Sequence, residues 1–273
     1  MGSTRYKLGF IGFGKMAEAI YQGISQRSLV SDERICFSEH NESRTSQVAS
    51  SLGIKSLSIE ELVQSSDIVL LCVKPQQVQE VLSQFPKQLY ATTCVVSILA
   101  GTPVRTLSDI LGADAQVCRA MPNTPLLLGE GMTALYRGHT VSDDNWTAVC
   151  DVFSTAGQVV DVDDESLLDV VTGVSGSGPA FLYRLASDIA ELGTKEGLSN
   201  ELSLQLIAQT MVGAGKMLLG SGKSPETLIQ DVSSPNGTTV AGLDQFDKTQ
   251  LSLDMQSVVQ ASIDRARELG GQS

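Results

Sequence analysis

The stretch GFIGFGKMA, residues 9–17, decides the fold of this chain. It follows a short apolar run and opens a helical pattern, with Gly12, Gly14 and Ala17 in the spacing Gly-x-Gly-x-x-Ala. The glycines permit a tight turn and bring a pyrophosphate close to the start of a helix, while the alanine keeps that helix near the strand. An ordinary glycine-rich turn is the alternative, but the place between strand and helix favours dinucleotide binding.

The first half of the chain alternates apolar runs with helical segments. The runs are apolar on both faces, as is typical of parallel strands buried between two layers of helices. The predicted strands are residues 6–11, 34–38, 67–73, 93–98 and 116–121, closed by 132–137 and 157–163. Ser58 is expected to cap one helix and Thr102 another, with Pro103 as its first helical residue. We predict an α/β fold with a Rossmann-type doubly wound parallel sheet.

After Asp164 the strand-like runs stop, and the rest of the chain reads as helices separated by Gly, Ser and Pro. Helices are expected from 178 to about 197, from 200 to 219, after Ser224 and at the C-terminal end. We therefore predict a dinucleotide-binding domain over 1–164 and a helical substrate-binding and dimerisation domain over 165–273. The segment from Asn200 is apolar on more than one face, which predicts burial against a partner subunit in a homodimer.

The composition excludes several kinds of partner. The formal net charge is −12, with 31 acidic and 19 basic residues and no basic run, so we expect neither nucleic acid nor a membrane as partner. Five cysteines without a CxxC pair and two histidines predict no metal site. No apolar run approaches a membrane span, and the chain enters a strand-like run within a few residues, which predicts a cytoplasmic protein.

The segment SSPNGTTVAGL, residues 233–243, has the features of a carboxylate site. Pro235, Asn236 and Gly237 make a turn, and the N–H groups of Gly237, Thr238 and Thr239 then fall in the first turn of a helix. Such N–H groups lack partners within the helix and attract anions. The alternative is a helix start that is merely capped by Ser or Thr.

Other short motifs fall where predicted strands end. VKP at 73–75, LAG at 99–101 and MPNTP at 121–125 would all lie at the edge where doubly wound sheets bind ligands, although each could be an ordinary turn.

The preferred dinucleotide is left open by the sequence. Glu39 stands where an acidic residue would bind a ribose 2′-hydroxyl and favour NAD, whereas His40 and Arg44 are near enough to receive the 2′-phosphate of NADP.

With these motifs in hand, the chain resembles the Δ1-pyrroline-5-carboxylate reductase family nearly end to end. GFIGFGKMAEAI, VKPQ, RAMPNTP, DVVTGVSGSGPAF, DVSSPNGTT and RAREL follow the order and spacing of that family. The resemblance implies reduction of the cyclic imine pyrroline-5-carboxylate to L-proline with NADPH or NADH. It also implies a helical dimerisation domain, and homodimers that assemble into larger rings such as a decamer.

The resemblance implies roles for individual residues. At the pyrophosphate it implies Gly12, Gly14, Lys15 and Met16, and at the adenosine ribose Ser38. Along the groove toward the nicotinamide it implies Lys74, Pro75, Ala100 and Asn123. Around the substrate it implies Ser234, Gly237, Thr238 and Thr239, with Ser175, Gly176 and Ser177 at the elbow between domains. The Thr239 hydroxyl is the candidate catalytic group, as a hydrogen-bond partner of the ring nitrogen.

The chain departs from the family in two places. Asn236 stands where a second glycine is usual, and Glu39 and His40 replace the Asn-Arg pair common in bacterial members that prefer NADP.

Two rival functions remain. A β-hydroxyacid dehydrogenase would carry a lysine and an asparagine where this chain has Leu182 and Ala186, and leucine cannot take a hydroxyl proton. A dinucleotide sensor without catalytic activity would bind the cofactor but not oxidise it.

Overall fold

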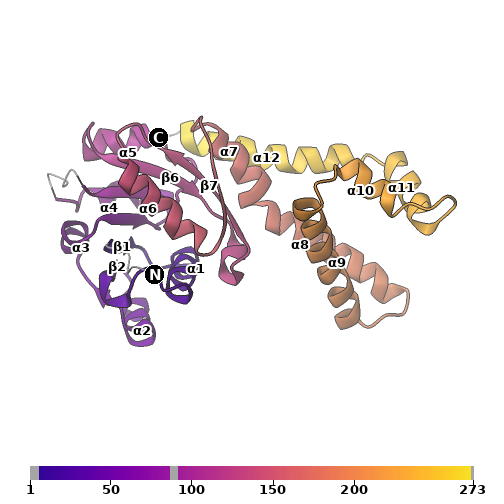
Figure 1. Ribbon diagram of the computed structural model, residues 1–273, viewed down its shortest axis with the longest axis horizontal. Coiled ribbons are helices and arrows are strands. Elements are labelled where there is room, and N and C mark those ends of the chain that lie inside the picture. The colour runs from indigo at the N-terminus through magenta and orange to yellow at the C-terminus, as the bar shows by residue number, and fades with distance from the viewer. Residues whose placement is uncertain (1–5, 87–91, 272–273) are drawn as a thin grey trace. The chain divides into compact units, whose positions relative to one another are not determined.

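The computed structural model describes residues 6–86 and 92–271, which form two compact units (Figure 1). The first unit comprises the residues up to Ser177 and those from Ala261 onward. The second unit comprises Gly178–Gln260.

In the described part of the chain the first unit contains one sheet of eight strands, in the order β3-β2-β1-β4-β5-β6-β7-β8. All neighbouring pairs are parallel except β6 and β7. The strands are β1 Leu8–Ile11, β2 Ile35–Ser38, β3 Lys55–Ser56, β4 Ile68–Leu71, β5 Cys94–Ser97, β6 Gln116–Met121, β7 Gly131–Arg137 and β8 Gly157–Asp161. Each predicted strand is present and the doubly wound fold is confirmed. The two-residue β3 was not predicted, because it is exposed and carries no apolar run.

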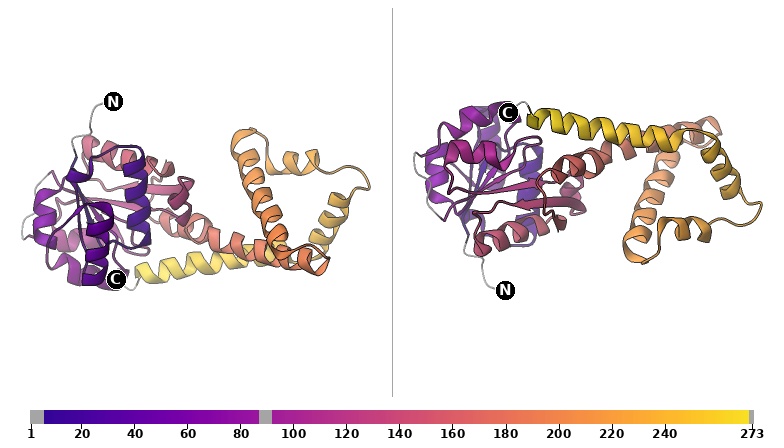
Figure 2. Two further views of the ribbon diagram at one scale, coloured as in Figure 1. Left: turned by 90° about the horizontal axis from the view of Figure 1, so that it is seen from below. Right: turned by 90° about the horizontal axis from the view of Figure 1, so that it is seen from above.

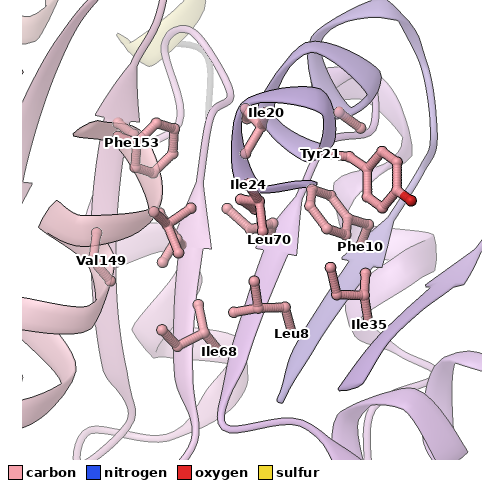
Figure 3. Packing of buried hydrophobic residues seen from close by; sticks show 14 of the residues in the cluster. Leu8, Phe10, Ile20, Tyr21, Ile24, Ile35, Ile68, Leu70, Val149 and Phe153 are labelled. Atoms are coloured by element: carbon pink, nitrogen blue, oxygen red, sulfur yellow. The ribbon is translucent and has the colours of Figure 1, made fainter. Parts of the chain in front are cut away.

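Successive residues of the central strands point into two separate cores, one on each face of the sheet. Leu8 and Phe10 of β1 enter the core that also holds Ile20 of α1 and Phe153 of α6, as Figure 3 shows. Ile11 enters the opposite core with residues of α3, α4 and α5. One face is covered by α1 Lys15–Gln26, α2 Glu42–Leu52 and α6 Asp143–Ser154, and the other by α3 Ile59–Ser65, α4 Val78–Leu82 and α5 Val104–Leu111.

The chain leaves the sheet through α7, Leu167–Val171, and a π-helical turn at Thr172–Gly176. Leu168 of α7 packs with Met121 and Ala134 at the ends of the sheet, which places this segment in the first unit. The compact division thus falls after Ser177 and not after residue 164. The predicted functional domains, 1–164 and 165–273, stay predictions, and their residues 1–5, 87–91 and 272–273 lie outside the described part.

The second unit is entirely helical in its described secondary structure (Figure 2). Its helices are α8 Gly178–Lys195, α9 Asn200–Gly220, α10 Pro225–Asp231, α11 Thr238–Lys248 and the first part of α12 Leu251–Gly271. Ser199 and Ser224 accept hydrogen bonds from N–H groups in the first turns of α9 and α10, as residues at helix starts commonly do. The last residues of α12 return to the first unit, where Leu269 and Gly270 approach Gly101.

The predicted start of α5 was wrong. The helix begins at Val104 and Pro103 is its cap residue, because Pro103 is still in an extended conformation. The Val104 N–H group donates to the Glu165 carboxylate over 2.6 Å. Glu165, which is distant in sequence, therefore accepts a hydrogen bond from the helix start, as Thr102 was expected to do.

One helix of the described residues, α9, is long and apolar enough to cross a membrane by length and composition, with a mean hydropathy of 1.2 over an 18-residue window. Several of its apolar side chains are exposed within this single chain, among them Leu202, Leu206 and Val212.

Candidate active site

The glycine-rich loop lies where the strand order reverses. β1 pairs with β2 on one side and with β4 on the other, so the connections from these strands leave in opposite directions. The Gly12 N–H group donates to the Ser38 carbonyl over 2.8 Å, and the Cys72 N–H group donates to the Ile11 carbonyl over 2.8 Å. The ends of three neighbouring strands are thereby joined at the switch point that binds ligands in such sheets.

Local geometry at this loop fits a pyrophosphate. Gly12 has φ +81°, and a Cβ there would lie 2.9 Å from the Cys72 carbonyl oxygen, so only glycine fits. A Cβ at Gly14 would meet open space. The N–H groups of Lys15 and Met16 begin α1 and have no partner in the described part of the chain, while Ala17 is fully buried beneath them. The start of α1 therefore presents free backbone donors to an anion.

Beside this loop lies a pocket of about 270 Å³. Its lining combines the ends of β1, β2 and β4 with side chains from α3 and α4: Ile11, Gly12, Ser38, Glu39, His40, Ser58, Ile59, Val73, Gln77, Glu80, Val81 and Gln84. Ser38, Glu39 and His40 were predicted for the ribose end of the cofactor. The residues of α3 and α4 were missed, because surface helix positions carry no motif that distinguishes them.

The Glu39 side chain is held in place by hydrogen bonds from backbone N–H groups, one of which belongs to the glycine-rich loop. Its carboxylate accepts from the Phe13 N–H group over 3.0 Å and from the Asn41 N–H group over 3.1 Å, and it lies 2.8 Å from His40 Nδ1. Burial alone would raise the pKa of this carboxyl, but these hydrogen bonds and the adjacent His40 lower the pKa below its ordinary value. Glu39 is therefore an ionised acceptor at the pocket.

Arg44 also contacts the loop, from α2. Its Nε donates to the Phe13 carbonyl over 3.1 Å, and one terminal nitrogen lies 2.8 Å from the Glu18 carboxylate. The remaining terminal nitrogen donates to Gln47.

The other predicted cofactor residues lie after β4, β5 and β6, at the same edge of the sheet. Exposed Lys74 precedes Pro75, which begins a short 3-10 turn, and the Lys74 N–H group donates to Gln77. Ala100 is half-buried against the small apolar cluster of Met121, Ala134 and Leu168.

Asn123 holds the end of β6 to the π-helical turn. Its amide nitrogen lies 3.3 Å from both the carbonyl oxygen and Oγ of Ser175, and its amide oxygen accepts from the Met132 N–H group over 2.9 Å. The structure thus brings together Asn123 and Ser175, which are far apart in sequence. A π-helical turn at this point is a feature frequent at functional sites.

Ser177 forms a hydroxyl–hydroxyl hydrogen bond of 2.8 Å with Ser262 of α12. Ser262 was missed, because a single serine in a C-terminal helix carries no local signal for a contact across 85 positions.

The segment 233–243, which was predicted to form a carboxylate site, belongs to the second unit. Gly237 is the cap residue of α11, and a Cβ there would lie 2.4 Å from Ser234 Oγ, so the close turn requires glycine. Asn236 has φ +56°, the left-handed conformation, which glycine and asparagine adopt more readily than other residues. The N–H groups and hydroxyls of Thr238 and Thr239 have no partner among the described residues.

Among the described residues no cluster of His, Cys, Asp or Glu is arranged to hold a metal ion. The donors present at both candidate sites are backbone N–H groups and hydroxyls, which suit phosphate and carboxylate groups.

The fold and the loop together define a dinucleotide-binding protein of the Rossmann type, followed by a helical domain. Comparison with known proteins narrows this class. Residues 165–269 match the family described as pyrroline-5-carboxylate reductase dimerisation, and residues 7–101 match NADP oxidoreductase coenzyme F420-dependent. The pyrroline-5-carboxylate reductase of Arabidopsis thaliana is 36% identical over 265 residues, which cover 97% of this chain and 95% of the relative. The chain belongs to the pyrroline-5-carboxylate reductase family.

Solved structures agree. The pyrroline-5-carboxylate reductase of Coxiella burnetii superposes with a TM-score of 0.90 at 28% identity, covering 97% of this chain and 99% of the other. The pyrroline carboxylate reductase of Plasmodium falciparum, with NADP bound, gives 0.88 at 29% identity, covering 98% and 100%. The family resemblance and the NAD(P)H-dependent oxidoreductase class predicted from sequence are confirmed. The roles of individual site residues stay predictions.

Proposed function

We propose that this chain reduces the cyclic imine 1-pyrroline-5-carboxylate to L-proline, with NADPH or NADH as hydride donor. The observation that carries the proposal is the start of α11, beside a turn that needs Gly237. There the N–H groups and hydroxyls of Thr238 and Thr239 have no partner among the residues that the structure describes. Family membership over 97% of the chain supports the same substrate.

The substrate carboxylate would be held by the backbone of this loop. The first N–H groups of α11 point outward from the helix start and carry partial positive charge. Ser234 and Thr238 add hydroxyl donors without a charge of their own. A small acid is thereby bound without an arginine, and its ring is directed by the remaining donor, Thr239.

Chemistry at the ring nitrogen makes little demand on the protein. An imine nitrogen can already carry a proton near neutral pH, and the iminium carbon accepts hydride readily, so positioning dominates. The Thr239 hydroxyl would hydrogen bond to the nitrogen as it becomes an amine. Ser175 and Ser177, at the end of the first unit, are further candidates for substrate binding, as the family resemblance implies.

The nicotinamide dinucleotide, when bound, supplies the hydride. Gly12, Gly14, Lys15 and Met16 would hold its pyrophosphate on the start of α1. Further along the sheet edge, the groove would be lined by Lys74, Pro75, Ala100 and Asn123. The NADP bound to the Plasmodium falciparum relative supports a nicotinamide dinucleotide as the cofactor.

We further propose a homodimer formed by the helical unit, as the match to a dimerisation family supports. Exposed apolar side chains on α8 and α9, including Tyr183, Leu192 and Leu206, supply a surface that a partner subunit would bury. A decamer built from such dimers is supported by the family resemblance alone. The cytoplasmic location and the absence of membrane binding stay predictions.

The test is the initial rate of cofactor oxidation on addition of pyrroline-5-carboxylate, with proline measured as product. The proposal expects cofactor consumption and proline formation in equal amounts. A sensor would bind the cofactor without consuming it. A β-hydroxyacid dehydrogenase would instead act on a hydroxy acid with the oxidised cofactor. Either result would exclude the proposal.

A further inference from the structure

We infer that the Glu39 carboxylate contacts the group at the 2′ position of the adenosine ribose and thereby lowers the affinity of this chain for NADPH relative to NADH. Arg44, on this inference, is not a phosphate-binding residue. The inference rests on the proposed nicotinamide site and assigns its specificity.

The first argument is the fixed position of the Glu39 carboxylate. One oxygen accepts from the Phe13 N–H group of the glycine-rich loop, and the other accepts from the Asn41 N–H group. Its side chain is only 9% exposed, so it cannot swing away from an incoming ligand without losing both bonds. A carboxylate has about four acceptor positions, which leaves capacity for a ribose hydroxyl.

The second argument is charge. A ribose 2′-hydroxyl can donate to the remaining lone pairs of Glu39, whereas a 2′-phosphate carries only acceptor oxygens and negative charge. Like charges brought together in a partly desolvated pocket repel each other. Backbone donors keep the Glu39 carboxyl ionised, so it repels a 2′-phosphate. Glu39 does not take up a proton near neutral pH that would relieve this repulsion.

The third argument is the engagement of Arg44. All three of its guanidinium nitrogens have acceptors within the protein, namely the Phe13 carbonyl, the Glu18 carboxylate and Gln47. The charge of the guanidinium is already paired with the Glu18 carboxylate, and Arg44 is not among the residues that line the pocket. The guanidinium therefore ties α2 to the glycine-rich loop and the start of α1.

The fourth argument is the rest of the pocket. Among its described lining residues are the carboxylates Glu39 and Glu80 and no lysine or arginine. His40 also lines the pocket, but its Nδ1 lies 2.8 Å from the Glu39 carboxylate. Nothing in this lining compensates the charge of a 2′-phosphate as an arginine fork would.

The experiment measures the dissociation constants of NADH and NADPH by cofactor fluorescence, without pyrroline-5-carboxylate. It compares the wild-type chain, Glu39→Gln, Glu39→Ser and Arg44→Ala. Glu42→Gln serves as the control, because it removes the same charge at an exposed position outside the pocket. Thermal unfolding of each variant confirms that it is folded, and the serine variant remains available if glutamine disturbs the loop.

We expect the ratio of the NADPH to the NADH dissociation constant to fall about tenfold in Glu39→Gln and to stay unchanged in Glu42→Gln. Arg44→Ala should weaken both cofactors alike. The inference is overturned if neither Glu39 variant lowers the ratio threefold, or if Arg44→Ala selectively weakens NADPH. Binding of both cofactors without turnover would overturn the proposed function and leave this inference standing, so the two failures are distinguishable.

Discussion

At the scale of the residue, Thr239 is the side chain on which the proposed chemistry depends most. It is the second residue of α11, and its exposed hydroxyl has no partner in the described part of the chain. Thr239→Ala should lower kcat roughly 10- to 100-fold, because a hydrogen bond to a group that changes charge is lost. Steady-state kinetics and NADPH titration together check this result.

The control for this variant is Thr239→Ser, which keeps the hydroxyl and should restore most of the turnover. Affinity for NADPH should remain near wild type in both variants. Unchanged kcat in Thr239→Ala would remove Thr239 from the mechanism.

Individual residues were predictable where backbone geometry singles out one amino acid. Gly12 and Gly237 could be found from sequence because a Cβ at either position collides with nearby atoms. The partners of Glu39 could not be found, because a backbone N–H group such as that of Phe13 looks the same at every position in a sequence. The same limit hid the bond between Asn123 and Ser175, which requires the fold to be known.

At the scale of the element, the start of α5 depends on an ion pair. Glu165 accepts from the Val104 N–H group, and it also accepts from the Arg119 guanidinium over 3.0 Å. Arg119 is only 4% exposed, so removal of Glu165 would leave a buried positive charge without its ion-pair partner. Glu165→Ala should lower the free energy of unfolding by about 2 kcal/mol, less than for a fully buried pair because Glu165 is partly exposed.

Urea unfolding followed by circular dichroism measures this change. Glu130→Ala is the matched control, since its side chain is exposed, and it should stay within about 0.5 kcal/mol of wild type. Equal stability of Glu165→Ala and Glu130→Ala would show that the ion pair contributes nothing.

Elements were predictable where period and turn residues agree, as in the buried strands β4 and β6. The start of α5 was displaced because Pro103 permits either a first helical residue or an extended cap. The choice is made by Glu165, which lies 61 positions further along the chain. A local pattern of Thr and Pro contains no information about that contact.

At the scale of the whole molecule, the apolar exposure of the helical unit predicts association. Leu206 is 52% exposed on α9 although it lies in a strongly apolar helix. Leu206→Glu should place a charge in the subunit interface and shift the mass in light scattering from an oligomer toward the 29.0 kDa monomer. Gln64→Glu adds the same charge at an exposed position of the first unit and should leave the mass unchanged.

The order of the fold, sheet first and helices second, was evident from where the apolar runs stop after Asp164. The compact division at Ser177 was not, because α7 is helical in sequence but packs on the sheet through Leu168. By length and composition alone α9 could cross a membrane, whereas its apolar pattern was predicted to lie in a subunit interface. A monomeric wild-type chain in light scattering would contradict the subunit interface.

The central claim is that hydride passes from a reduced nicotinamide to the imine carbon of pyrroline-5-carboxylate on this chain. The most direct measurement is the mass of the proline formed with NADPH that carries deuterium at both C4 positions of the nicotinamide. The account predicts proline one mass unit heavier than that formed with unlabelled cofactor. Unlabelled proline, or no proline, would contradict it.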